Sequence, residues 1–205
     1  MEGILHLPFF VFSSFLLIIT PGPDFIFVVN KGISEGRKSG VLAALGIGIG
    51  LLFHTSLAAI GISAIIKASE VLYLAVKFIG AVYILYLGFK ALKTVKETKL
   101  QTYQSKKKSK SIQQGIVTNL FNPKTILTFL AYLPQFVDSD IHNTTKQLFL
   151  LGIILTILAV IWFLLMGFFA GSIGVYVSKN KQLQKIINTI SAITMILLGL
   201  IMLCF

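Results

Sequence analysis

Six long apolar stretches occupy almost the whole chain and limit what it can fold into. A helix that spans a membrane needs about 20 mainly apolar residues, and an apolar stretch of 18 or more is typical of one. Six such helices would use about 120 residues of the 205 in the chain, which leaves no room for a separate soluble domain. The sequence therefore predicts an all-α membrane protein with six transmembrane helices. The stretches cover residues 4–29, 41–66, 71–92, 112–137, 148–177 and 183–205.

The composition favours a membrane protein over the soluble classes. Hydrophobic residues make up 56% of the chain and charged residues only 12%, against about a quarter in ordinary soluble domains. These values exclude a soluble globular domain, a disordered chain and a small disulfide scaffold. The single cysteine, Cys204, cannot close an intrachain disulfide, and the three histidines are far apart in sequence. We therefore expect neither a metal site nor a cofactor.

The distribution of basic residues predicts how the chain is oriented. The net charge is +11, and fourteen of the eighteen basic residues lie in or beside the first, third and fifth connectors. This placement indicates membrane topology rather than nucleic-acid binding, and the positive-inside rule assigns the three connectors to the cytoplasm. Six spans then place both termini outside. The N-terminal stretch has no basic flank and no small-residue cleavage site, so we expect a retained span rather than a signal peptide.

The third connector, residues 93–111, is an extended polar segment rich in Lys, Ser and Gln. We interpret it as a basic cytoplasmic linker between two halves of the chain, residues 1–92 and 112–205. Clusters of four to eight basic residues beside a span attract anionic lipid headgroups, so lipid contact is an alternative to a solvated linker. The lysines available for that contact are Lys106, Lys107, Lys108 and Lys110.

Two apolar stretches contain segments that a continuous helix cannot accommodate. The first contains Thr20-Pro21-Gly22-Pro23-Asp24, whose two prolines remove two backbone donors and clash with the preceding turn. The fourth contains Asn119-Leu120-Phe121-Asn122-Pro123-Lys124. The breaks lie 100 positions apart, with Asp24 corresponding to Lys124.

The spacing of the two breaks suggests that the chain consists of two three-helix repeats. Because three is an odd number of spans, the second repeat would be inverted in the membrane relative to the first. Interrupted helices at corresponding positions of two inverted halves are the best sequence indication of a transporter binding site. Their free N–H groups attract carboxylates, and their freed carbonyls attract ammonium groups or cations.

Asp24 and Lys124 place one charge of each sign at the breaks. Charges inside a membrane are expensive and should face the protein interior. The two side chains could pair with each other and lock the halves together. They could equally bind the two ends of a zwitterion, with Asp24 holding an α-ammonium group and Lys124 an α-carboxylate. The second arrangement makes an α-amino acid the natural substrate.

Four motifs, in order along nearly the whole chain, resemble the lysine-exporter/threonine-resistance (LysE/RhtB) family of bacterial amino-acid exporters. Each motif is weak by itself, and together they are specific. They are Thr20-Pro21-Gly22-Pro23-Asp24, Gly32-x3-Gly36-Arg37-x2-Gly40, Lys77-x2-Gly80-Ala81-x-Tyr83-x2-Tyr86-Leu87-Gly88 and Asn119-x2-Asn122-Pro123-Lys124.

The resemblance implies a multi-pass protein of the bacterial inner membrane that exports amino acids or close derivatives from the cytoplasm. It also implies that the segments of the two breaks form the transport site. The candidate substrate-binding residues are Thr20, Pro21, Gly22, Pro23, Asp24, Asn119, Asn122, Pro123, Lys124 and Lys77.

Three further features have both a functional and a structural interpretation. His54, in the middle of the second stretch, is either a proton relay or a neutral histidine bonded to a carbonyl or hydroxyl group. Lys77 either reaches the outer surface or lines a cavity near the exit. The glycine pairs Gly46/Gly50 and Gly167/Gly171 favour close helix contact, within the chain or in a homodimer.

The preferred hypothesis is a secondary transporter that exports amino acids, coupled to protons through Asp24 or His54. The chain has no Walker motif, so we do not expect it to use ATP directly. An ion or small-solute channel is the alternative, although the spans offer few charges for a continuous polar path. We do not expect an enzyme, because the chain lacks a Gly-x-Ser-x-Gly motif and Asp24 is the only aspartate within a predicted span.

Overall fold

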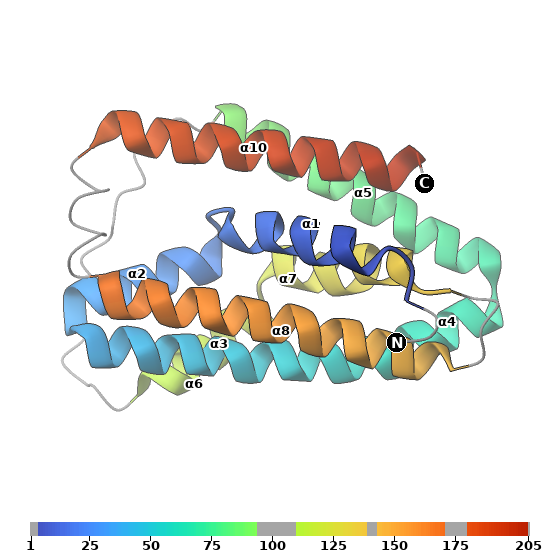
Figure 1. Ribbon diagram of the computed structural model, residues 1–205, viewed down its shortest axis with the longest axis horizontal. Coiled ribbons are helices and arrows are strands. Elements are labelled where there is room, and N and C mark those ends of the chain that lie inside the picture. Colours follow the sequence, from blue (N-terminus) through green and yellow to red (C-terminus); the bar gives the residue numbers. More distant parts are fainter. Residues whose placement is uncertain (1–3, 94–109, 139–142, 171–179, 205) are drawn as a thin grey trace.

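The computed structural model describes residues 4–93, 110–138, 143–170 and 180–204, and its regular structure is helical (Figure 1). This agrees with the predicted all-α class. Two short π-helical segments, η1 and η3, interrupt or extend α-helices. The elements are α1 (Leu7–Ile19), α2 (Pro23–Glu35), α3 (Arg37–Leu57), η1 (Ala58–Ile62), α4 (Ser63–Ala68), α5 (Glu70–Lys93), α6 (Ser111–Leu120), α7 (Pro123–Leu127), η3 (Thr128–Tyr132), the 3-10 turn η4 (Leu133–Phe136), α8 (Thr144–Phe169) and α10 (Lys181–Cys204).

Within the described residues, three helical segments are long and apolar enough to cross a membrane by themselves. They are Arg37–Ile62, Val71–Lys90 and Thr144–Phe169. Helices α1 and α2 meet the same criteria only as a pair, bent by 54° at the break between them. The predicted interruption of the first stretch is therefore confirmed, whereas the count of six spans stays a prediction.

Several helices begin earlier than the apolar stretches that predicted them. Helix α3 starts at Arg37 rather than at residue 41, and α8 starts at Thr144 rather than at residue 148. Polar residues at the edge of a span still form helix, so hydropathy alone underestimates the helix length. The turn before α3 is made by Gly36, whose φ of 88° is strained for other residues although the space around it is open.

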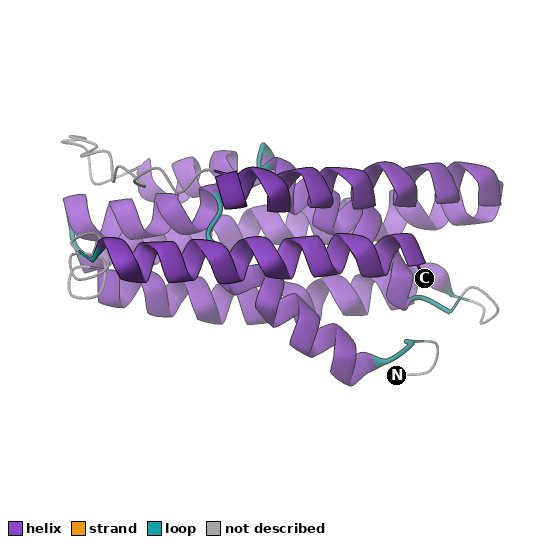
Figure 2. Cartoon of the chain, turned by 90° about the horizontal axis from the view of Figure 1, so that it is seen from above, coloured by secondary structure: helices purple, strands orange, loops and turns teal. Residues whose placement is uncertain are grey.

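The helices form two packed groups on either side of the broken segments (Figure 1). Helix α3 packs mainly against α8 and α6, and α5 packs against α10. Helices α1 and α7 lie between these groups. Most helices follow the long axis of the molecule, and the N-terminal helix leaves that axis at an angle (Figure 2).

One end of the molecule is held by contacts between glycine backbones. A Cβ atom at Gly40 would lie 2.6 Å from the Gly167 carbonyl oxygen, and one at Gly32 would overlap Ala170. Helices α2 and α3 therefore approach the end of α8 closely, with only the Ala170 methyl group in the contact at Gly32. The predicted close contact at Gly167 is confirmed, while Gly171 lies outside the described residues.

The second predicted glycine pair brings α3 against α6. A Cβ at Gly46 would overlap the Ile112 backbone, and one at Gly50 would lie 2.5 Å from the Asn119 Oδ1 atom. Both glycines thus confirm the prediction of close helix contact within the chain.

Lys31 is not in the first connector, as its position in the sequence suggested. It lies in α2 and forms a buried ion pair with Glu35, with a Nζ–Oε1 distance of 2.6 Å. Its charge is neutralised within the protein, because an unpaired charge cannot be buried cheaply. The basic residues at this end of the helices are then Arg37 and Lys38, in the first turn of α3.

Candidate functional site

The first break forms because two prolines lack the backbone N–H that a helix needs. Pro21 cannot donate to the Leu17 carbonyl one turn earlier, so α1 ends at Ile19. Gly22 is extended and precedes α2, where Pro23 occupies the first turn. Asp24 therefore lies at the N-terminus of a helix, where a carboxylate is electrostatically favoured.

The second break is built from an N-cap. The Asn122 Oδ1 atom accepts a hydrogen bond of 3.0 Å from the Lys124 backbone N–H, and Pro123 opens α7. Pro123 also deprives the Asn119 carbonyl of its usual partner four residues on. The Asn119 carbonyl accepts instead from the Asn122 backbone N–H, at 3.0 Å.

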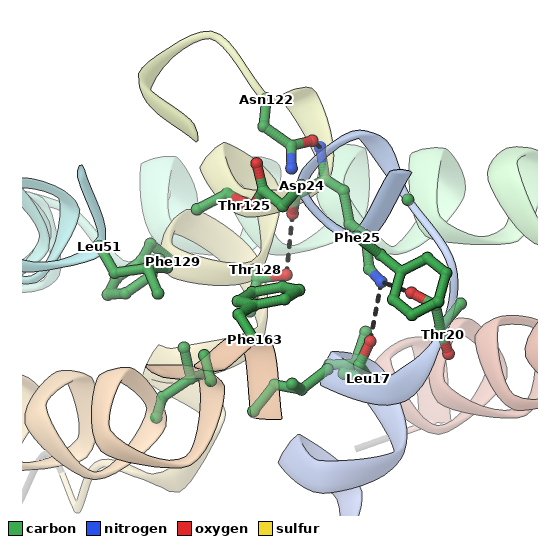
Figure 3. Close-up of a pocket in the computed structure, with 15 residues that line it drawn as sticks. Leu17, Thr20, Asp24, Phe25, Leu51, Asn122, Thr125, Thr128, Phe129 and Phe163 are labelled. Carbon is green, nitrogen blue, oxygen red and sulfur yellow. Dashed lines mark hydrogen bonds between the residues drawn. The ribbon is translucent and has the colours of Figure 1, made fainter. Parts of the chain in front are cut away.

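Lys124 joins the two breaks directly. Its Nζ atom donates to the carbonyl oxygens of Leu17, at 2.7 Å, and Thr20, at 2.8 Å (Figure 3). At Leu17 the ammonium group replaces the donor that Pro21 lacks, and it lies at the negative C-terminal end of α1. Gly22 leaves room for this contact, since a Cβ atom there would lie 3.2 Å from the Lys124 Cδ atom.

Asp24 is buried and its two oxygens have different surroundings. Oδ2 accepts hydrogen bonds from the Asn119 Nδ2 atom, at 2.8 Å, and the Thr125 hydroxyl, at 3.2 Å. Oδ1 is buried without a hydrogen-bond partner among the described residues. Among the described residues, Asp24 and Lys124 do not form an ion pair with each other. The two halves are instead linked by hydrogen bonds from Lys124 to backbone carbonyls and by hydrogen bonds to Asp24 from an amide and a hydroxyl group.

A small cavity of about 50 Å³ lies between the two breaks. Ligand pockets for small molecules are typically about 300–1,000 Å³, so this conformation must widen to admit an amino acid. One part of the lining is polar and the rest is apolar (Figure 3). The polar residues are Thr20, Asp24, Asn122, Lys124, Thr125 and Thr128, and the apolar ones are Leu17, Ile18, Phe25, Leu51, Phe129, Leu155, Ala159 and Phe163.

His54 contacts the second break from the α3 side. Its Nε2 atom lies 3.3 Å from the Asn119 carbonyl oxygen, which also accepts from the Asn122 backbone N–H. Its ring stacks on Phe129 with 5.6 Å between centroids. This contact matches the interpretation of His54 as a histidine bonded to a carbonyl. Lys77 lies in α5, and its side chain is outside the described part of the structure.

A buried polar and aromatic cluster joins α1 to η3 and η4, further along these elements than the cavity lining. The Tyr132 hydroxyl lies 2.6 Å from the Ser13 Oγ atom and 3.1 Å from that of Ser14. Phe10 of α1 and Phe136 of η4 pack against the Tyr132 ring.

Sequence reasoning missed Thr125 and the Tyr132 cluster. The signal available for each was a polar side chain within an apolar stretch, directly after Lys124 in one case and in the Ser13-Ser14 pair in the other. The backbone carbonyls of Leu17 and Thr20 carry no signal in their side chains. The Leu17 carbonyl could have been found by asking which carbonyl loses its donor at Pro21, whereas no proline lies four residues after Thr20.

The chain matches the LysE type translocator family over residues 15–204. It belongs to this family. The match confirms the resemblance drawn from the four motifs and identifies a membrane transport protein.

Individual relatives align over most of their length. The uncharacterized membrane protein YrhP of Bacillus subtilis (strain 168) is 33% identical, over 90% of this chain and 92% of its own. The leucine efflux proteins of Enterobacter sp. (strain 638) and Klebsiella pneumoniae are 31% and 29% identical, and the alignments cover 89% and 90% of those proteins. No solved structure matches the chain at a comparable level.

Proposed function

We propose that this protein is a secondary transporter that exports amino acids with apolar side chains across the bacterial inner membrane. The observation that carries the proposal is the cavity between the two helix breaks, which has a carboxylate and an ammonium group in one wall and apolar side chains in the others. Two relatives named leucine efflux protein support the same class of substrate.

The cavity has groups suited to each part of such a substrate. Asp24 Oδ1 has no hydrogen-bond partner among the described residues and can accept a hydrogen bond from an α-ammonium group. Lys124 uses two of its three N–H donors on carbonyls, and it can turn toward an α-carboxylate. Phe25, Leu155 and Phe163 would then contact an aliphatic side chain.

Asp24 is the better candidate for coupling to protons. A proton and the substrate ammonium group would compete for the same oxygen, so that only one of them is carried at a time. Among the described residues, the hydrogen bonds between His54 and Asp24 run through Asn119, by its backbone carbonyl on one side and its side-chain amide on the other. Neither group passes a proton readily, so we assign His54 the role of holding the second break in position.

The inverted-repeat arrangement is part of the proposal. The second predicted span packs against the fifth, as α3 on α8, and the third against the sixth, as α5 on α10. Pairing of corresponding spans is what a two-fold relation between residues 1–92 and 112–205 requires. The basic connectors would face the cytoplasm, with both termini outside.

The test is counterflow of labelled amino acids in liposomes that contain the purified protein. We expect saturable exchange of leucine and similar amino acids by the wild type, and loss of at least about tenfold, equivalent to about 1.4 kcal/mol, in Asp24→Asn and Lys124→Ala. Lys146→Ala, an exposed lysine in the first turn of α8, is the control and should behave like the wild type.

Three other outcomes would change the conclusion. Exchange that survives both substitutions would leave a transporter whose charges serve only as a lock. Flux that does not saturate would favour a channel. Full retention of proton-driven efflux by Asp24→Asn would remove Asp24 from the coupling step.

A further inference from the structure

The side chain of Lys124 carries an ammonium group, which an amino-acid substrate also has, and places it at the first break. Its ammonium group is bound by the carbonyls of Leu17 and Thr20, at 2.7 and 2.8 Å. Both carbonyls line up at the C-terminal end of α1, where the helix dipole and the missing N–H of Pro21 favour a cation. Asp24 and Lys124 line the same cavity.

We propose that the carbonyls of Leu17 and Thr20, together with Asp24 Oδ1, form the subsite for the substrate ammonium group, and that Lys124 fills this subsite between substrates. The inference rests on the proposed function and adds to it a position for each end of the substrate. Lys124 is then an internal stand-in for the substrate rather than a fixed part of the fold.

The attachments of Lys124 allow its side chain to move while its backbone stays in place. Its backbone N–H donates to Asn122, at 3.0 Å, and its carbonyl accepts from the Thr128 hydroxyl, at 2.8 Å. The side chain is held by the two carbonyls of α1. A four-carbon chain with rotatable bonds can leave these carbonyls without any change in α7.

A zwitterion can replace Lys124 without leaving a charge unpaired. Its carboxylate attracts the lysine ammonium group, and its own ammonium group takes the vacated carbonyls. A molecule with an ammonium group alone cannot do this, because it would bring a second cation beside Lys124 in a medium of low dielectric constant. The arrangement therefore selects for substrates that carry both charges.

The test uses 3-methylbutylamine, which is leucine without its carboxylate, and measures its binding to purified protein by titration calorimetry. We expect Lys124→Met to bind the amine at least about tenfold more tightly than the wild type does, a difference of about 1.4 kcal/mol. Lys146→Met is the matched control and should bind like the wild type. The alcohol 3-methyl-1-butanol should show no such gain, which separates charge recognition from a larger apolar cavity.

Equal amine binding by Lys124→Met and the wild type would overturn the inference and make Lys124 a fixed link between the breaks. Leucine binding by the wild type is measured in parallel, so a failure of the proposed function is seen separately. If Lys124→Met does not fold, the Lys124→Ala variant is tested instead. The amine 3-methylbutylamine should raise the melting temperature of Lys124→Ala, and the absence of any rise would also contradict the proposal.

Discussion

Pro21 and Pro123 each lie four residues after a carbonyl group, those of Leu17 and Asn119. At Leu17 the lost backbone donor is replaced by the Lys124 ammonium group, which comes from the second break. The Asn119 carbonyl instead accepts a hydrogen bond of 3.0 Å from the Asn122 backbone N–H, and His54 Nε2 is a further partner at 3.3 Å. Because buried carbonyls require partners, Pro21 explains at the scale of a single residue why a lysine is buried here.

Gly50 offers a test of how tightly the site is packed. A Cβ atom there would lie 2.5 Å from Asn119 Oδ1 and 2.9 Å from Asn119 Cβ. Gly50→Ala should push Asn119 away from Asp24, lower the stability by about 1–3 kcal/mol and weaken leucine binding. Thermal unfolding and calorimetry would measure the two effects.

Gly61→Ala is the matched control for this substitution. Nothing lies within 4 Å of a Cβ atom at that position, so the stability should stay the same or rise slightly. Equal stability of the two alanine variants would show that Asn119 is free to move.

The breaks themselves were predictable from the sequence, because proline acts locally and Pro21, Pro23 and Pro123 are visible in any apolar stretch. Their partners were not. Asp24 and Asn119 are 95 positions apart, and their contact depends on how α2 and α6 pack. The π-helical segments η1 and η3 were also missed, because such a local change of winding leaves the apolar pattern of the stretch unchanged.

Pro21→Ala restores a backbone donor to the first break. The new N–H can bond to the Leu17 carbonyl and compete with Lys124, so α1 should extend and substrate binding should fall by about tenfold or more. Counterflow and circular dichroism would report the two changes. Pro8→Ala is the control, since Pro8 lies in the first turn of α1, where no earlier carbonyl needs its N–H. Unchanged counterflow in Pro21→Ala would show that the Leu17 carbonyl need not be free.

The molecule as a whole places the broken segments between the α3, α6 and α8 group and the α5 and α10 pair (Figure 1). Sequence hydropathy predicted which residues form helices, but it did not predict which helices pack together. Side chains that face lipid are as apolar as side chains that face another helix, so the sequence pattern does not distinguish the two. The orientation in the membrane is likewise predicted from charge alone.

Cysteine labelling tests that orientation. Ser34, in the last turn of α2, and Asn143, directly before α8, are both exposed. The end of α2 and the start of α8 lie at opposite ends of the molecule (Figure 1). In a Cys204→Ser background, Ser34→Cys should react only with thiol reagents that reach the cytoplasm. Asn143→Cys should react with impermeant reagents from outside. The reverse pattern would contradict the positive-inside assignment.

The glycine contacts and the Tyr132 cluster make the two ends of the molecule mechanically unlike. At Gly32, Gly40 and Gly167 there are no side chains to rotate, so parting the helices would separate whole backbones. At Phe10, Tyr132 and Phe136 the contact is made by aromatic rings and hydroxyls, so parting the elements there would separate side chains. Relative motion of the helices would therefore disturb backbone packing at the glycines and side-chain packing at the aromatic cluster.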